Sequence, residues 1–512
     1  MIAVYNYGSQ FTHLIARRLR ALNVHAEVFA PETSAADLSR RRPSGVVLSG
    51  SPSSVSDPGA PSVDPDVFEL GIPLLGICYG EQLMVKLLGG RIGTGSSGQY
   101  GKETVTNGPD AAPLLAGLPS EHTVWFSHGD QVTALPDGFT ALGRTASCEF
   151  AAIADPARRL YGLQFHPEVA HTEHGTDILR NFALTICKDP AGWTVGRVRD
   201  AIGTRLRQRL GTEGDVIVGV SGGVDSMVAA TLLNELVPDR LHAVFVDTGL
   251  LRQDEAEEVS AAFAERGFRD FRRIDAADTF FDKLAGVTDP EKKREIIGHT
   301  FIELFETEAD RIGKVAPVRF LAQGTIYPDR IESAQPSQHA AKIKSHHNLT
   351  LPEKLKLEIV EPLAELYKDE VRELGMQLGL PPHLIARHPF PGPGLAIRIL
   401  GTVTPERVRT LQAADAVYLQ ELRTSGEYDR IWQAFAALLP VKSVGVMGDA
   451  RTYEDIISLR AVTSVDGMTA DWYKFPPEVL ERVSSRIVNE VAGVNRVLYD
   501  VTQKPPGTIE YE

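Results

Sequence analysis

Cysteine is scarce in this sequence, with three residues among 512 and none in a Cys-x-x-Cys spacing. This number is too small for a disulfide framework, and the spacing predicts no cysteine-based metal site. No apolar run approaches the roughly 20 residues that span a bilayer. The stretch 1–5 predicts a strand, with no basic leader or cleavage site around it. We therefore expect a cytoplasmic protein without membrane contacts.

Positive charge is also in short supply. The chain has 53 Lys and Arg against 67 Asp and Glu, which gives a formal net charge of -14. Such a balance argues against non-specific binding to nucleic acid and to anionic membranes. With 43% hydrophobic and 23% charged residues, the composition is typical of globular proteins. An anionic ligand must therefore be met by local cationic side chains rather than by the overall field.

Short apolar segments alternate with helical patterns in two stretches of the chain, which predicts parallel sheets. Proline-rich residues 388–394 interrupt the second stretch, and the residues after them mix helical and strand patterns. At 512 residues the chain is too long for one core. The predicted fold class is α/β, with two consecutive parallel-sheet α/β domains (1–190 and 191–387) followed by a smaller α+β domain (388–512).

Ser-Gly-Gly-Val-Asp-Ser at 221–226 follows an apolar strand and precedes a predicted helix. A glycine-containing turn of this kind directs backbone N–H groups and a helix N-terminus at one point, which favours an anion. A Walker A loop would end in Gly-Lys-Ser/Thr, whereas this turn has Asp225 and no lysine. The pattern predicts that this turn binds pyrophosphate through Mg²⁺ near Asp225. The residues expected to hold the phosphates are Ser221, Gly222, Gly223, Val224, Asp225, Ser226 and Met227.

Cys78 lies in Gly-Ile-Cys-Tyr-Gly, at another predicted strand-to-helix turn. Glycines on both sides permit a strained turn that projects the middle side chain, and a helix N-terminus with a nearby imidazole lowers a thiol pKa. We predict Cys78 as the nucleophile, His166 as the general base and Glu168 as the carboxylate that orients it. The N–H groups of Ser51 and Tyr79 are the predicted oxyanion hole. A buried core cysteine is the alternative, which the combined pattern disfavours.

Cys78 with His166-x-Glu168 resembles the triad of class I glutamine amidotransferases, and the 221–226 turn resembles the PP-loop of N-type ATP pyrophosphatases. In this order, with the tail 504–510, they resemble glutamine-hydrolysing GMP synthetases over the whole chain. The resemblance implies that ammonia from glutamine aminates xanthosine monophosphate (XMP) after MgATP has adenylated its C2 oxygen. AMP, pyrophosphate and GMP are then the products. The alternative is an amidotransferase-ligase of the same build that acts on a different purine nucleotide.

The resemblance also implies roles for further residues. It assigns XMP binding to Arg252, Lys504 and Glu510. It assigns a lid over the adenylate to Asp329, Glu332 and Lys344. For the XMP-binding residues the alternative is surface salt bridges, and for the lid residues it is a solvated loop. For Lys293-Arg294, a solvated helix face is as good an explanation as a functional role.

The implied cofactors are ATP and Mg²⁺, without zinc, haem or flavin. The implied partners are the small molecules glutamine, ATP and XMP, with no nucleic acid and no membrane. The resemblance also implies a homodimer formed through the C-terminal domain, which contributes to the XMP site.

Several positions depart from the usual residues of that family: Asn6, Ser51, Thr248, Ala450 and Tyr511. None belongs to the triad or to the PP-loop. Ser51 stands where a second glycine is usual, and its Cβ is expected to narrow the glutamine pocket.

Overall fold

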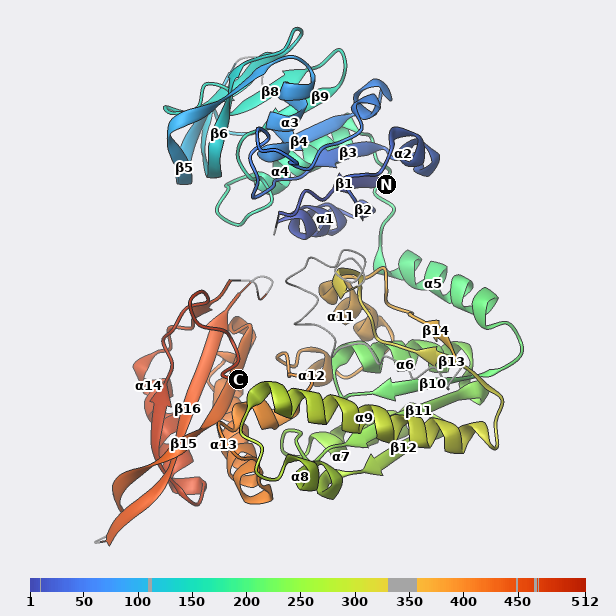
Figure 1. Ribbon diagram of the computed structural model, residues 1–512, viewed down its shortest axis with the longest axis vertical. Helices are drawn as coiled ribbons and strands as arrows, with labels where there is room; N and C mark the ends of the chain where they lie inside the picture. Colours follow the sequence, from blue (N-terminus) through green and yellow to red (C-terminus); the bar gives the residue numbers. More distant parts are fainter. Residues whose placement is uncertain (10, 109–112, 330–356, 448–449, 465–466, 468) are drawn as a thin grey trace. The chain divides into compact units, whose positions relative to one another are not determined.

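The computed structural model describes residues 1–9, 11–108, 113–329, 357–447, 450–464, 467 and 469–512 (Figure 1). The chain divides into two compact units, Met1–Val198 and Arg199–Glu512, which we describe separately. None of the helices in these ranges combines the length and the apolarity needed to span a bilayer.

The first unit is built on a nine-stranded sheet in the order β2-β1-β3-β4-β9-β8-β7-β5-β6. The parallel part consists of β2 (Ala26–Phe29), β1 (Ile2–Tyr5), β3 (Gly45–Leu48), β4 (Leu74–Ile77) and β9 (Leu160–Leu163). The antiparallel part consists of β8 (Ala152–Asp155), β7 (Thr140–Arg144), β5 (Arg91–Asn107) and β6 (Glu121–Ala134). The central parallel strands are buried along their whole length, which explains their unbroken apolar sequences.

Four α-helices pack on this sheet: α1 (Thr12–Ala21), α2 (Ala35–Arg41), α3 (Tyr79–Leu87) and α4 (Gly175–Arg180). Helix α3 makes its main contacts with β4, the strand that it directly follows. The turn between β4 and α3 is thereby held between the sheet and the helix.

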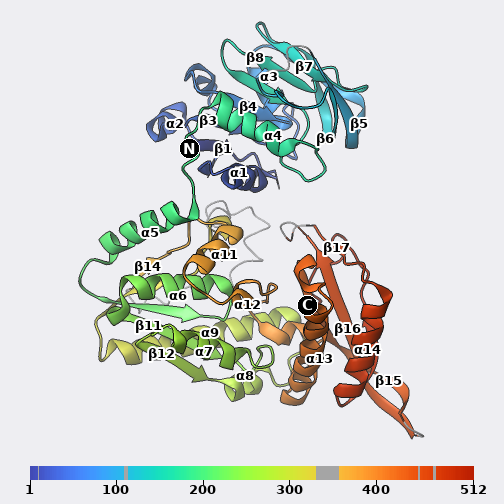
Figure 2. The same ribbon diagram turned by 180° about the vertical axis from the view of Figure 1, so that it is seen from behind.

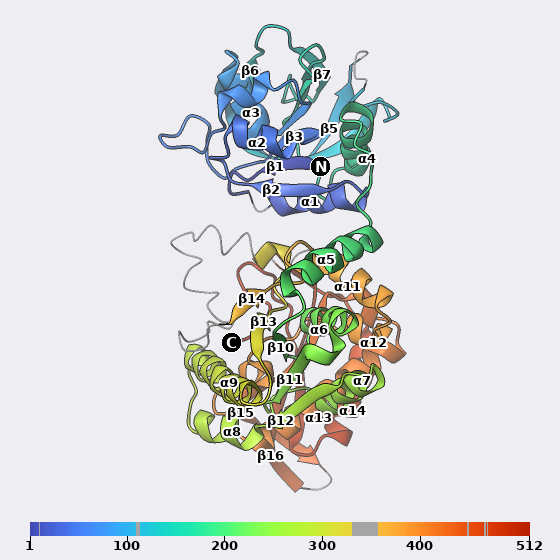
Figure 3. The ribbon, with the colours of Figure 1, turned by 90° about the vertical axis from the view of Figure 1, so that its right-hand side faces the viewer.

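A parallel five-stranded sheet organises the first part of the second unit. Its order is β12 (Asp270–Asp275), β11 (Leu241–Asp247), β10 (Asp215–Val220), β13 (Val318–Ala322) and β14 (Glu358–Val360). Helix α9 (Pro290–Gly313) lies on one side of the sheet and α6 (Val224–Leu236) on the other (Figure 3). Further α-helices in the described residues of this part are α5 (Val195–Leu210), α7 (Glu255–Glu265), α8 (Ala277–Leu284), α11 (Lys368–Gln377) and α12 (Pro382–Ile385). Since all five strands are parallel, their carboxyl ends meet at one edge, where ligands bind in open α/β sheets.

The second part of this unit contains a long antiparallel hairpin, β15 (Gln433–Met447) and β16 (Ala450–Thr463). Strands β17 (Asp471–Trp472) and β18 (Val494–Tyr499) pair with β16. Helices α13 (Pro405–Thr424) and α14 (Pro477–Glu490) pack against each other and against this sheet (Figure 2). One continuous hydrophobic core joins both parts of the unit, from Phe280 and Leu321 to Ile457 and Leu459.

The predicted fold class is confirmed: parallel-rich α/β sheets precede a smaller α+β region. The antiparallel extension β8-β7-β5-β6 of the first sheet was not predicted, because the alternation of apolar segments and helices marks only the parallel strands.

Candidate active sites

Cys78 occupies the turn between β4 and α3. Its φ of 52° and ψ of -107° are strained for a residue with a side chain. The turn packs tightly against β3, since a Cβ at Gly80 would lie 2.2 Å from the carbonyl oxygen of Leu48. The Cys78 side chain is therefore projected from a strained turn at a helix N-terminus, which is the geometry of a nucleophile elbow.

His166 and Glu168 form a buried pair, with 2.7 Å between Nδ1 of the imidazole and Oε1 of the carboxylate. The backbone N–H of His166 donates to the carbonyl oxygen of Trp125 at 3.0 Å, which fixes its position. Burial lowers the pKa of His166, but the charges of Glu168 and Cys78 and hydrogen bonds to both raise it to about 10. At neutral pH the site therefore favours the imidazolium form of His166.

The loop after β3 lies against the same histidine. A Cβ at Gly50 would be 3.2 Å from Cε1 of His166. The next residue is Ser51, whose Oγ accepts a hydrogen bond from the N–H of Ser53 at 3.2 Å within its own loop. The phenol of Tyr79 is buried and donates to the carbonyl of Pro61, so it is not an oxyanion donor. Of the two predicted oxyanion residues, Ser51 thus follows Gly50, which lies beside His166, and Tyr79 directly follows Cys78.

The Ser221–Ser226 turn joins β10 to α6, with Gly222 at a φ of 79°. Its two serines stabilise its shape. Oγ of Ser226 accepts from the N–H of Ser221 at 3.1 Å and donates to the carbonyl of Gly223 at 3.0 Å. Val224 and Met227 are buried, and the N–H of Met227 donates to the carbonyl of Gly223.

A lysine that the sequence analysis missed completes this turn. Lys368 is the first residue of α11, and its Nζ lies 2.6 Å from Oδ2 of Asp225 across 143 residues of sequence. The other oxygen of Asp225, Oδ1, is buried and has no hydrogen-bond partner among the described residues. The PP-loop therefore lacks a lysine in its own sequence but receives one from a distant helix.

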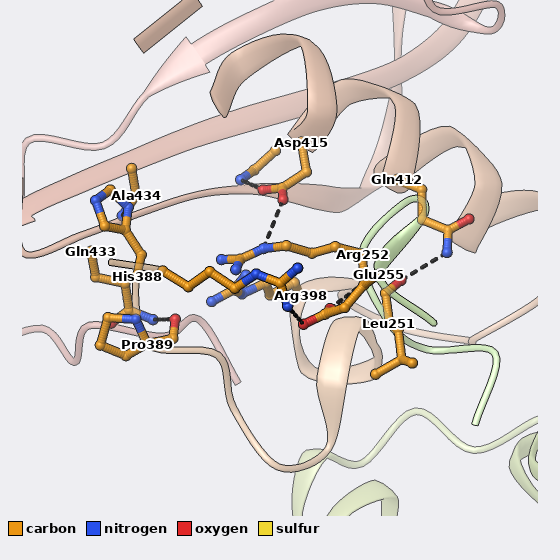
Figure 4. Close-up of polar contacts among 12 residues, drawn as sticks. Leu251, Arg252, Glu255, His388, Pro389, Arg398, Gln412, Asp415, Gln433 and Ala434 are labelled. Atoms are coloured by element: carbon orange, nitrogen blue, oxygen red, sulfur yellow. Dashed lines mark hydrogen bonds and ion pairs between the residues drawn. The ribbon is translucent and has the colours of Figure 1, made fainter. Parts of the chain in front are cut away.

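A third cluster lies where the two parts of the second unit meet (Figure 4). The guanidinium groups of Arg252 and Arg398 lie 4.7 Å and 5.1 Å from the centre of the Phe390 ring. Nε of Arg252 is 3.3 Å from Oδ2 of Asp415, and Arg398 donates to both carboxylate oxygens of Glu510 at 3.0 Å and 2.8 Å.

Each arginine of this cluster keeps a buried Nη atom without a hydrogen-bond partner in the described part of the chain. These atoms are Nη2 of Arg252 and Nη1 of Arg398. Two buried guanidinium groups with unused N–H groups form a site suited to an oxyanion such as a phosphate. Arg252 and Glu510 are predicted from the resemblance, but Arg398 is not, because no local pattern indicates its burial.

Lys504 does not join this cluster. Its Nζ donates to the carbonyl of Gly467 at 2.8 Å, and its backbone pairs with Ala470. Of the predicted lid, Asp329 accepts a hydrogen bond from the N–H of Ile326 at 3.3 Å, whereas Glu332 and Lys344 lie outside the described residues. The solvated-face interpretation is wrong for Lys293, whose side chain is 0% exposed.

A strained cysteine beside a buried histidine–carboxylate pair, joined to a PP-loop unit, defines a triad-class amidotransferase fused to a nucleotide-binding ligase unit. Family models match residues 3–186 (Glutamine amidotransferase class-I), 195–286 (NAD synthase) and 420–511 (GMP synthase C terminal domain).

Two full-length relatives are similar to the chain and carry the same name, GMP synthase [glutamine-hydrolyzing]. The protein from Phenylobacterium zucineum is 54% identical over an alignment of 516 positions, which covers 100% of this chain and 98% of the relative. The protein from Solidesulfovibrio magneticus is 50% identical over an alignment of 515 positions, which covers 100% of this chain and 99% of the relative. The chain belongs to the family of glutamine-hydrolysing GMP synthases.

Replacing Glu168 by glutamine is expected to lower glutaminase kcat/KM by roughly 10²–10⁴-fold and to move its alkaline limb to lower pH. Burial lowers the pKa of His166, and the Glu168 carboxylate is the main group that raises it to about 10. Without that charge the pKa of His166 falls, so the imidazolium loses its proton at lower pH and the general acid is lost earlier. The check is glutamine hydrolysis measured across the alkaline range.

Glu173→Gln is a suitable control for this experiment, because Glu173 is a nearby carboxylate that bonds to the backbone N–H of Thr123 rather than to His166. An alkaline limb that stays in place in Glu168→Gln would contradict the assigned role of Glu168.

Proposed function

We propose that this chain aminates XMP to GMP with ammonia from glutamine, through an adenylyl-XMP intermediate, and releases AMP and pyrophosphate. The observation that carries the proposal is the presence in one chain of an elbow cysteine site and a PP-loop next to a buried arginine pair. A ring carbonyl oxygen is a poor leaving group, whereas AMP is a good one, so adenylation prepares the C2 position for ammonia. The full-length likeness to GMP synthases supports this substrate class.

In the first unit, the Cys78 thiolate attacks the amide carbon of glutamine. The N–H groups of Ser51 and Tyr79 stabilise the oxyanion. The His166 imidazolium donates its proton to the departing ammonia, and the neutral imidazole then activates the water that hydrolyses the thioester. Glu168 keeps the ring oriented and stabilises its cationic form.

In the second unit, the N–H groups of the 221–226 turn and the N-terminus of α6 hold the β- and γ-phosphates of ATP, which leave together. Oδ1 of Asp225 fits a Mg²⁺ ligand, since it is a carboxylate oxygen without a protein partner. In the described ranges, no group of three or more His, Cys, Asp or Glu side chains gathers for a metal. That pattern agrees with Mg²⁺ bound by one carboxylate together with phosphates, where it would offset their charge.

Lys368→Met is expected to lower kcat/KM for ATP in the ammonia-dependent reaction by about 10–100-fold, because a charged group near the phosphates is lost. Lys368→Arg should retain part of the activity, and glutamine hydrolysis should be unaffected. Lys283, whose exposed ion pair with Glu303 lies at the surface, offers the control Lys283→Met. Unchanged kinetics in Lys368→Met would exclude Lys368 from the ATP site.

We propose that Arg252 and Arg398 meet the phosphate of XMP beside Glu510, and that Lys504 contacts XMP from the tail, outside the arginine cluster. Asp329, Glu332 and Lys344 are the proposed lid, which would exclude water from the adenylate. The buried, unused Nη atoms of the two arginines support the phosphate assignment.

The experiment that tests the proposed function measures pyrophosphate release from MgATP and ammonia, with XMP and with a panel of other purine nucleotides. Release that requires XMP is the expected result. Release with another nucleotide and none with XMP would favour the same chemistry on a different purine, which is the alternative function.

We further propose the functional division 1–190 (glutaminase), 191–387 (ATP pyrophosphatase) and 388–512 (dimerisation and acceptor binding). We also propose a cytoplasmic location, which cell fractionation would test.

A homodimer through the C-terminal region is supported by exposed apolar residues on its hairpin. Val444 and Tyr453 are cross-strand partners, and Val446 is 76% exposed. A dimer in sedimentation that Val446→Glu converts to a monomer is expected, and a monomeric wild type would contradict this proposal.

A further inference from the structure

Lys293 is a fully buried lysine near the start of α9. Its Nζ donates to the carbonyl oxygens of Ala396 at 3.2 Å and Ile399 at 2.7 Å, and it forms an ion pair with the carboxylate of Glu512. These contacts use all three ammonium hydrogens. Burying a charge costs free energy. A buried lysine whose hydrogens are all paired therefore indicates a role in fixing local geometry rather than in raising the free energy of unfolding.

The partners of Lys293 belong to the two segments that form the acceptor site. Ala396 and Ile399 flank Arg398, and Glu512 lies two residues beyond Glu510. Arg398 and Glu510 are themselves joined by two hydrogen bonds. One ammonium group therefore holds the backbone on both sides of the arginine and the chain next to the carboxylate.

The rest of the tail is held from a different direction. Arg460 is buried and donates to the carbonyl oxygens of Thr502 at 2.7 Å, Thr508 at 2.9 Å and Ile509 at 3.1 Å. These contacts end before Glu510. Glu512 is anchored by Lys293 and by the N–H of Gly401, 3.3 Å from its second carboxylate oxygen. Glu510 is thus fixed by one anchor before it and one after it.

We propose that Lys293 and Glu512 are positioning residues that set the geometry of Arg398 and Glu510 for the nucleotide acceptor. The proposal rests on the proposed function, because it assigns this cluster to XMP. Neither residue needs to touch the acceptor. Arg294 and the N–H of Gly401 also contact Glu512, so losing the ion pair loosens rather than frees the end of the tail and the backbone around Arg398. Acceptor binding therefore weakens while the triad and the PP-loop are left intact.

The test compares Lys293→Met, Glu512→Gln and the double variant with the wild type. We expect the KM for XMP to rise about ten- to a hundredfold in each, in line with the loss of a charged hydrogen bond. The KM for ATP and the rate of glutamine hydrolysis should be unchanged. Glu512→Gln strands a buried ammonium group and should have the lowest Tm, and the double variant should recover part of that loss.

The Tm and the KM for XMP separate positioning from folding stability. If the pair is only structural, the KM for XMP stays at the wild-type value in the folded variants, or returns to it as the Tm recovers in the double variant. Either result overturns the proposal. Lys283→Met, at an exposed ion pair against the same helix, should change neither quantity.

Failure of the proposed function has a different signature. In that case the wild type itself releases no pyrophosphate with XMP, whatever the variants do. The same three variants are then compared with the purine nucleotide that does support release, and an unchanged KM for that nucleotide overturns the positioning role.

Discussion

Cys78→Ala is expected to abolish glutamine-dependent GMP formation while leaving amination with added ammonia. Removing the nucleophile should lower glutamine hydrolysis by roughly four to six orders of magnitude. The residues proposed to bind ATP and the acceptor all lie in the second unit, so we expect it to need only ammonia from the first. The measurement is GMP formation by the purified variant with glutamine and, separately, with an ammonium salt.

Cys187→Ala is the matched control for this experiment. Burial raises the pKa of the Cys187 thiol, and the residue lies in the core of the same unit, away from the elbow. It should keep both activities. Loss of the ammonia-dependent reaction in a folded Cys78→Ala protein would contradict the division of chemistry between two sites.

Asp225→Ala is expected to lower the rate of GMP formation by roughly 10²–10⁴-fold or more, both with glutamine and with ammonia as the nitrogen source. The change removes the only carboxylate of the PP-loop turn and leaves Lys368 without its partner. The measurement is pyrophosphate release with XMP and ammonia, with glutamine hydrolysis followed in parallel to show that the first unit is intact.

Asp239→Ala provides a control for the loss of an ion pair in the same unit, because Asp239 is 64% exposed and pairs with Arg269 at the surface. It should keep full activity. Ammonia-driven amination that persists in Asp225→Ala would remove the PP-loop from the mechanism.

Sequence patterns were most informative where the chemistry is local. Cys78 and Asp225 each lie in a short turn whose glycines, strand and helix follow one another in the chain, so the pattern contains most of the geometry. His166 and Glu168 are two residues apart, and their hydrogen bond could be expected from that spacing.

Residues brought in from distant elements could not be found in this way. Lys368 reaches Asp225 only because α11 packs on α6, and Arg398 reaches Glu510 across 112 residues. Lys293 stands in a helix with charged neighbours, where a buried lysine and an exposed one have the same local sequence. Their roles depend on tertiary packing, which the periodic pattern of a single sequence does not reveal.

The ion pair between Lys368 and Asp225 also means that each of these side chains can exchange its partner for an opposite charge on the bound nucleotide. Before the nucleotide arrives, each side chain neutralises the other, so the pocket does not present a bare carboxylate to an incoming polyanion. With MgATP bound, the ammonium group would be able to contact a phosphate and the carboxylate the cation, so neither side chain would be left without an opposite charge. We therefore expect the KM for ATP to depend only weakly on ionic strength in the wild type and more strongly in Lys368→Met, which a salt titration would show.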